Sequence, residues 1–182
     1  MNAIIHLATG FGIALTIIDA QSPKACTLHT AGLAVAGFAA GIIVHALLDY
    51  APHCYPVNSR VDFISSLILL GVLIVTARKQ YRLLLCCCLT GSVLPDIADL
   101  LPAIVNKQLG WHLPVSRTPL FPWHQQIYSG SVYSGDCGVS NLNTGMVLAA
   151  VTGIVLLKRK GLRAIFSLKI STIYKKPRAG RK

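Results

Sequence analysis

Three side chains with metal-binding chemistry stand close together where a long apolar run ends. His45 and Asp49 are four residues apart, so on a helix they share one face. Pro52 ends the predicted helix, and His53 can then fold back toward the same point. Two imidazoles and a carboxylate are suitable ligands for zinc or a similar divalent ion. Because ionisable groups at the edge of a bilayer-length segment are costly, their presence there predicts a functional site.

Two further carboxylates interrupt a second apolar run. Asp96 and Asp99 follow Pro95, and Pro102 comes soon after them. A helix broken by polar groups is tolerated at membrane depth only where it lines a cavity or is buried in protein. At this spacing both carboxylates can face one cavity, where they could bridge two ions or divide the roles of ligand and general base. We therefore expect Asp96 and Asp99 to be catalytic residues of a hydrolytic metal site that His124 completes.

The composition is that of an integral membrane protein. Of the 182 residues 53% are hydrophobic and only 13% are charged, against about 25% charged residues in soluble domains. The mean hydropathy is +0.59. The six acidic residues are all Asp, so each carboxylate needs a specific explanation. The sequence contains no nucleophile elbow, phosphate-binding loop or His-Glu-x-x-His motif.

The apolar runs predict an all-α integral membrane bundle of about four to five helices. The five segments are residues 3–19, 30–49, 62–77, 83–105 and 143–157. The first, third and fifth are short for a full span, which takes about 20 residues. Gly37 and Gly41 have the small-residue spacing that allows close contact between helices.

We expect residues 1–157 to form the membrane domain, with a long polar loop at 106–142, and residues 158–182 to form a basic tail. The tail holds ten of the 17 Lys and Arg residues, and the net charge is +11. A basic segment after an apolar one favours the cytoplasmic side and contact with anionic membrane lipid. No nucleic-acid-binding module accompanies it, which argues against nucleic acid as a partner.

Charge bias also predicts the orientation. With the tail in the cytoplasm of an inner or plasma membrane, five spans place the N-terminus and the 106–142 loop outside. Five of the six His then collect at the external face, together with Asp49, Asp62, Asp96 and Asp99, although Lys and Arg alone determine this orientation.

The six cysteines do not predict a disulfide scaffold. Cys86, Cys87 and Cys88 are consecutive within an apolar run, and no Cys-x-x-Cys pair is present. We expect Cys26, Cys54 and Cys137, like these three, to be packing residues.

The motif from His45 to His53, then Gly91 to Asp96, then an aromatic-His element at Trp123-His124, resembles the membrane-bound metal-dependent hydrolase family of YdjM-like inner-membrane proteins. That family is itself distantly similar to zinc-dependent phospholipase C. The resemblance covers residues 6 to about 127. It implies six metal ligands: His6, His45, Asp49, His53, Asp96 and His124. The chain departs from the pattern at Cys54, where an acidic residue is common, and at Tyr128, where a second His can stand.

The sequence thus predicts a metal-dependent hydrolase with a divalent ion, zinc first among the candidates, that acts on phosphodiester or lipid-linked substrates. A non-catalytic membrane protein is the alternative, either an ion or proton pathway or a partner-binding protein. Polar groups across both membrane halves would favour the pathway. Among single residues, Asp62 could instead cap its helix or pair with Arg60, and His112 beside Trp111 fits an interfacial loop.

Overall fold

The computed structural model describes residues 1–18, 28–133 and 135–166, and this part of the chain is helical apart from loops and one isolated β-bridge. The elements are α1 (Ala3–Ile17), α2 (Leu28–Tyr50), α3 (Ser59–Thr76), α4 (Lys79–Asp99), α5 (Leu101–Leu109), the short 3-10 helix η1 (Pro122–His124), α6 (Gly138–Leu157) and α7 (Arg159–Phe166). The predicted all-α bundle is confirmed.

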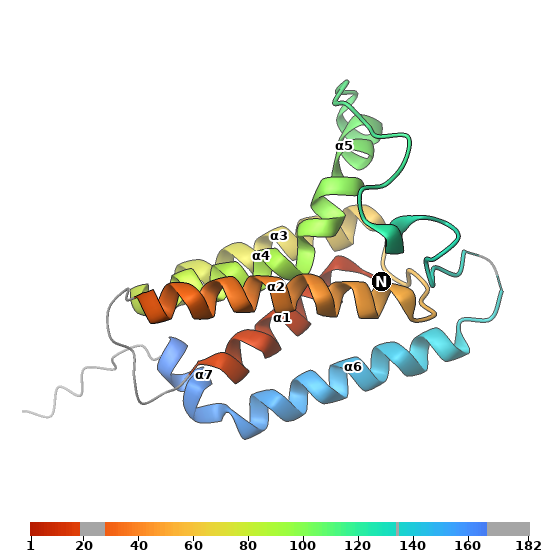
Figure 1. Ribbon diagram of the computed structural model, residues 1–182. Helices are drawn as coiled ribbons and strands as arrows, with labels where there is room; N and C mark the ends of the chain where they lie inside the picture. The colour runs from red at the N-terminus through yellow and green to blue at the C-terminus, as the bar shows by residue number, and fades with distance from the viewer. Residues whose placement is uncertain (19–27, 134, 167–182) are drawn as a thin grey trace, which may run out of the picture.

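Four of these helices are long and apolar enough to cross a membrane: α2 from His29, α3, α4 and α6. Their outward faces carry exposed apolar side chains, such as Val35 and Val75, each about 70% exposed. Side chains of this kind on a long helix are suited to contact with lipid. With 15 residues, α1 is too short to count as a fifth span. It contacts α2, α3, α4 and α6, and Figure 1 shows it tilted within the bundle.

The core of the bundle lies where α1, α2 and α4 meet. Leu7 and Leu15 of α1 and Leu85 and Leu89 of α4 are at most 1% exposed. Ile165 of α7 joins this cluster, so the first residues of the predicted basic tail pack on the bundle as a helix. Residues 167–182 lie outside the described part of the chain.

Glycines bring α2 and α4 into close contact, as the small-residue spacing predicted. A Cβ atom on Gly41 would lie 2.7 Å from the backbone nitrogen of Ser92, and one on Gly91 would meet the backbone of Phe38. Gly37 likewise faces the side chain of Cys88. This contact fixes the distance between the two helices that carry most of the candidate site.

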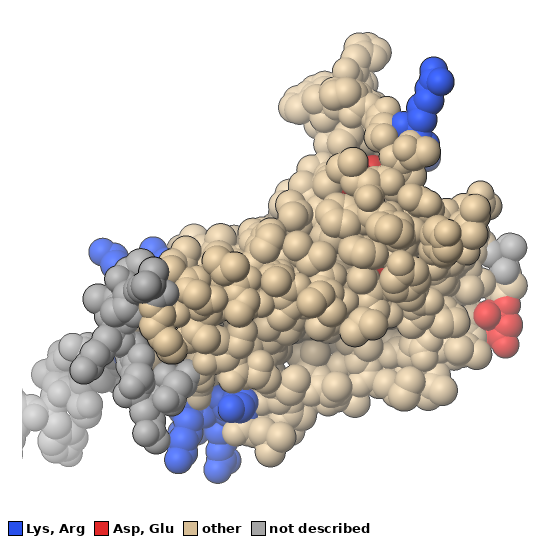
Figure 2. Space-filling model, viewed as in Figure 1, with Lys and Arg blue, Asp and Glu red and all other residues tan. Residues whose placement is uncertain are grey.

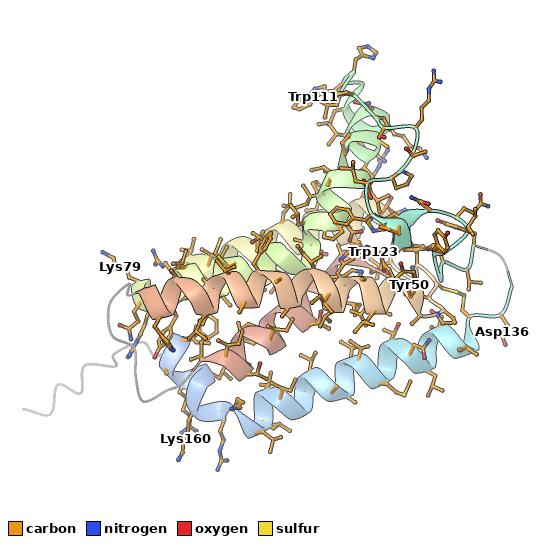
Figure 3. All side chains as sticks on the ribbon, in the orientation of Figure 1. Tyr50, Lys79, Trp111, Trp123, Asp136 and Lys160 are labelled. Atoms are coloured by element: carbon orange, nitrogen blue, oxygen red, sulfur yellow. A yellow bond between two sulfur atoms is a disulfide. The ribbon has the colours of Figure 1, made fainter. Side chains whose placement is uncertain are left out.

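The predicted segment 83–105 is two helices rather than one. The α-helix continues through Pro95 and ends at Asp99, and α5 begins at Leu101 with Pro102 in its first turn. Proline is tolerated there because its missing N–H would have no helical partner. From this corner α5 projects away from the bundle as an arm, with Trp111 near its tip (Figures 1 and 3).

The bundle has two chemically different ends. We call the end formed by the starts of α1, α3 and α6 and the last turns of α2 and α4 the site end, and the opposite end the basic end. Lys79 and Lys160 lie at the basic end, and Asp136 lies at the site end (Figure 3). Between the two ends the visible surface is almost free of charge (Figure 2).

A disulfide joins Cys54, after α2, to Cys137, at the start of α6. The expectation that these two cysteines are packing residues was therefore wrong. Their Cα atoms are 6.0 Å apart although 83 positions separate them in sequence, so only the tertiary fold reveals the pair. Cys86, Cys87 and Cys88 are free thiols, and Cys26 lies outside the described residues.

Candidate metal centre

Four side chains converge at the site end of the bundle. The last turns of α2 supply His45 and Asp49, the last turn of α4 supplies Asp96, and η1 supplies His124. One ligand atom from each lies within 4.8 Å of the ligand atoms of the other three. Asp49 Oδ2 is 3.2 Å from both His45 Nε2 and His124 Nε2, and Asp96 Oδ1 is 3.3 Å from His124 Nε2. All four residues come from the predicted set.

The two histidines of this cluster are oriented by hydrogen bonds on their outer nitrogens. His45 Nδ1 donates to the carbonyl oxygen of Ser92 at 2.8 Å. His124 Nδ1 donates to Asp99 Oδ2 at 2.9 Å. In each ring the Nε2 atom therefore faces the cluster, and these two Nε2 atoms are 3.3 Å apart. Fixing a metal-binding histidine through its second nitrogen is the usual arrangement in metalloproteins.

Asp99 holds the loop that carries His124. Its carboxylate also accepts hydrogen bonds from the backbone nitrogens of Leu120, at 2.8 Å, and Phe121, at 3.0 Å. Its side chain is only 1% exposed, and it is not one of the four converging ligands. The structure thus gives Asp96 a direct place in the cluster and Asp99 a place behind His124.

His6 lies beside the cluster with its ring nitrogens unpaired. Its ring stacks on His45 with 3.9 Å between ring centroids, and its Nε2 is 3.2 Å from Asp49 Oδ1. Neither nitrogen makes a hydrogen bond within the described chain, although the residue is fully buried. The His6 ring thus faces Asp49 without a well-aligned hydrogen bond, and a cation beside Asp49 would give its Nε2 a partner.

The start of α1 is anchored to the same place. The amino group of Met1 is 2.6 Å from Asp49 Oδ1. Asp62, at the start of α3, accepts hydrogen bonds from the backbone nitrogens of Ala3 and Ile4. Asp62 thus caps α1, not α3 as the sequence suggested; the α3 cap is Asn58.

His53 lies at the edge of the cluster and faces hydroxyl groups. Its Nδ1 donates to the carbonyl oxygen of Ala51 at 2.8 Å. Its Nε2 is 3.1 Å from the Tyr55 hydroxyl, 3.0 Å from Ser131 Oγ and 3.8 Å from Asp49 Oδ1. A bridge between the backbones of His53 and Ser131 holds this arrangement. Sequence reasoning missed Tyr55 and Ser131, because the only local signal for Ser131 was a run of small residues.

The local electrostatics favour a positive charge in the cluster. Burial disfavours the His124 imidazolium, but hydrogen bonds to Asp49, Asp96 and Asp99 outweigh burial and raise the pKa of His124 to about 10. Burial instead lowers the pKa of His53. The carboxylates that stabilise a cation on His124 are suitable ligands for a divalent ion at the same point.

The remaining His and Asp residues lie apart from the cluster. His29 and His112 are exposed. Asp136 accepts a hydrogen bond from the backbone nitrogen of Gly138 at the start of α6. Asp19 is outside the described residues.

Two imidazoles and two carboxylates around one point form a donor set that zinc and related divalent ions accept. Trp123 lies beside the cluster, with its ring centroid 6.3 Å from that of His45 and 6.2 Å from that of Tyr50 (Figure 3). No protein-family model, curated protein or solved structure matches this chain.

Proposed function

We propose that the protein is a membrane-bound metal-dependent hydrolase whose ion, zinc, is held by His45, Asp49, Asp96 and His124. The observation that carries the proposal is the convergence of these four buried or half-buried side chains at the end of membrane-spanning helices. His6, whose Nε2 lies 3.2 Å from Asp49 Oδ1, is a fifth candidate ligand. His53 is a more distant one.

The donor set supports metal-assisted hydrolysis, and the phosphodiester as the bond comes from the position of the site and from the family resemblance of the sequence. A divalent ion held by imidazoles and carboxylates acts as a Lewis acid and activates water near neutral pH. Asp96 is the most exposed carboxylate of the set, with 17% of its side chain accessible against 4% for Asp49. Asp96 is therefore best placed to meet a substrate and, through the oxygen that does not bind the ion, to accept a proton from the attacking water. A phosphodiester is the proposed substrate bond.

Two features support an external position for the site end. Disulfides persist in oxidising compartments and are rare in the cytosol, and Cys54–Cys137 joins two loops at this end. The basic end holds Lys79 and Lys160, and the positive-inside rule places such residues in the cytoplasm.

The buried core argues against the alternative of a proton or ion pathway. Between the cluster and the basic end, the largest fully buried side chains of the described chain are apolar, among them Leu15, Leu85 and Leu89. A pathway would need polar groups or water along this length.

The test is hydrolysis of a water-soluble phosphodiester, bis(p-nitrophenyl) phosphate, by full-length protein purified in detergent with added zinc. Asp96→Asn keeps the side-chain volume and removes the charge, so we expect kcat to fall by about 100-fold or more, the usual contribution of a general base. Asp136→Asn is the matched control, because Asp136 is exposed and lies outside the cluster.

An Asp96→Asn protein with bound metal and wild-type turnover would refute the catalytic assignment. A wild-type protein that binds zinc but hydrolyses neither this diester nor any phospholipid would refute the hydrolase proposal and leave the metal site standing.

A further inference from the structure

We infer that the cavity beside Asp96 is the binding site for an acyl chain of a membrane phospholipid. The inference deepens the proposed function, because it assigns that site a glycerophospholipid as substrate. The observations that define the cavity are independent of the proposed catalytic activity.

The cavity has a volume of about 180 Å³ and lies between α1, α3, α4 and the start of α5. Its wall is mostly apolar and includes Leu7, Phe63, Leu70 and Val93. An apolar cavity of roughly 150 Å³ is large enough to take up benzene. This cavity can therefore accept several methylene groups of a hydrocarbon chain.

The cavity reaches from the metal cluster to the outside of the bundle. Asp96 is part of its wall and is also one of the four converging ligands. Leu67, Ile97 and Leu100, elsewhere in the wall, are 49%, 38% and 38% exposed. A chain in the cavity would thus have one end beside the candidate metal and the other at the apolar outer surface.

The position of the cavity among membrane-spanning helices indicates that its ligand is a lipid. The cavity lies between α3 and α4, both of which are long and apolar enough to cross a membrane. Only 11% of the apolar stretch of α3 is buried inside the protein, so in a bilayer most of it faces acyl chains. The compound that meets this surface at the highest concentration is membrane lipid.

One buried polar atom inside this apolar wall supports a lipid ester as the ligand. Ser66 is 6% exposed, and its Oγ has no hydrogen-bond partner in the described chain. It lies four residues after Asp62 and four before Leu70, so all three line the cavity from one face of α3. Both oxygens of Asp62 are already bonded to α1. The ester carbonyl of a phospholipid would supply the acceptor that the Ser66 hydroxyl lacks.

The test is photo-crosslinking of full-length protein in detergent with a phosphatidylglycerol that carries a diazirine on its acyl chain, followed by peptide mapping. We expect saturable labelling of α3 and of the region around Ile97. Ser66→Leu fills the cavity and should reduce this labelling by at least about tenfold, since one misplaced methylene in an apolar pocket costs that much or more. Ser65→Leu, on the same helix but outside the cavity wall, is the matched control and should label as wild type does.

Two further variants keep the test independent of folding and of catalysis. Leu67→Trp fills the cavity from a half-exposed position that the fold tolerates, and it should reproduce the loss. His124→Ala removes a candidate metal ligand that is not part of the cavity wall and should leave the labelling in place, so a failed hydrolase proposal would not be confused with a failed lipid site. Labelling that is unchanged in both cavity-filling variants, or that spreads evenly over α2 and α6, would overturn the inference.

Discussion

The residues of the candidate centre fall into two groups with different tasks. His45, Asp49, Asp96 and His124 present ligand atoms to one point. Behind them, the Ser92 carbonyl and the Asp99 carboxylate accept hydrogen bonds from the outer nitrogens of the two histidines. Such supporting groups fix the ring orientation and often matter nearly as much as the ligands themselves.

Asp99 provides a prediction at this scale. Its two oxygens accept three hydrogen bonds, from His124 Nδ1 and from the Leu120 and Phe121 backbone. Asp99→Asn removes the negative charge and one of the two acceptor oxygens, so the hydrogen bonds that orient His124 and its loop should weaken. We expect zinc affinity, measured by competition with a chromogenic chelator, to fall by about 10- to 100-fold.

Asp136→Asn serves as the control for this measurement, because it removes a carboxylate of the described chain that lies outside the cluster. Equal zinc affinity in Asp99→Asn and wild type would show that Asp99 only anchors the loop.

The candidate ligands of the cluster were predictable from the sequence, whereas most of the residues that contact them were not. His45, Asp49 and Asp96 stand out because ionisable groups are costly in apolar segments. No such rule marks Ser131, whose hydroxyl reaches His53 only through a loop 78 positions away. The contact between the Met1 amino group and Asp49 has no sequence signal either, because it depends on the packing of α1 against α2.

At the scale of elements, the site depends on how closely α2 and α4 approach. The two helices meet through glycine, and the His45 hydrogen bond to Ser92 crosses this contact. A methyl group at Gly41 would strike the backbone of Gly91 and Ser92.

We therefore expect Gly41→Ala to destabilise the protein by about 1–3 kcal/mol, the usual cost of overpacking. Thermal unfolding of the purified protein in detergent measures the effect. Gly32→Ala, on the same helix, adds its Cβ where no atom lies within 4 Å and should be neutral or slightly stabilising. Equal stability of the two variants would contradict this prediction, because only Gly41 lies at the contact between the helices.

The helices themselves were predictable, because a long apolar run in a membrane satisfies its backbone hydrogen bonds by forming a helix. The corner between α4 and α5 was not, since a proline within a helical pattern indicates a break without giving its position. Here the helix tolerates Pro95 and ends at Asp99, which places Asp99 directly behind His124. The disulfide was also beyond prediction, because its partners meet only when α6 packs beside the loop after α2.

At the scale of the whole molecule, two kinds of chemistry are separated along the bundle. The His/Asp cluster and the disulfide lie at the site end, and most of the described Lys and Arg side chains lie at the basic end (Figures 2 and 3). This separation leads to a prediction of topology. The site end should be external and the C-terminus cytoplasmic.

Reporter fusions check this orientation directly. A reporter that works only in the cytoplasm should be active after Lys182 and inactive when inserted after Gly110, in the arm that projects at the site end. The reverse pattern of reporter activity would contradict this orientation. It would mean that the site end, with the Cys54–Cys137 disulfide, lies in the reducing cytoplasm.

The central claim is that the cluster holds a metal ion, and metal analysis tests it most directly. Full-length protein purified from zinc-replete cells should contain about one zinc per chain, because the described residues bring one set of four ligand atoms to a single point. His45→Ala opens the set and should lose most of the metal after dialysis, whereas His29→Ala, an exposed histidine near the other end of α2, should keep it. A wild-type protein without bound divalent metal, or a His45→Ala variant with full occupancy, would contradict the account.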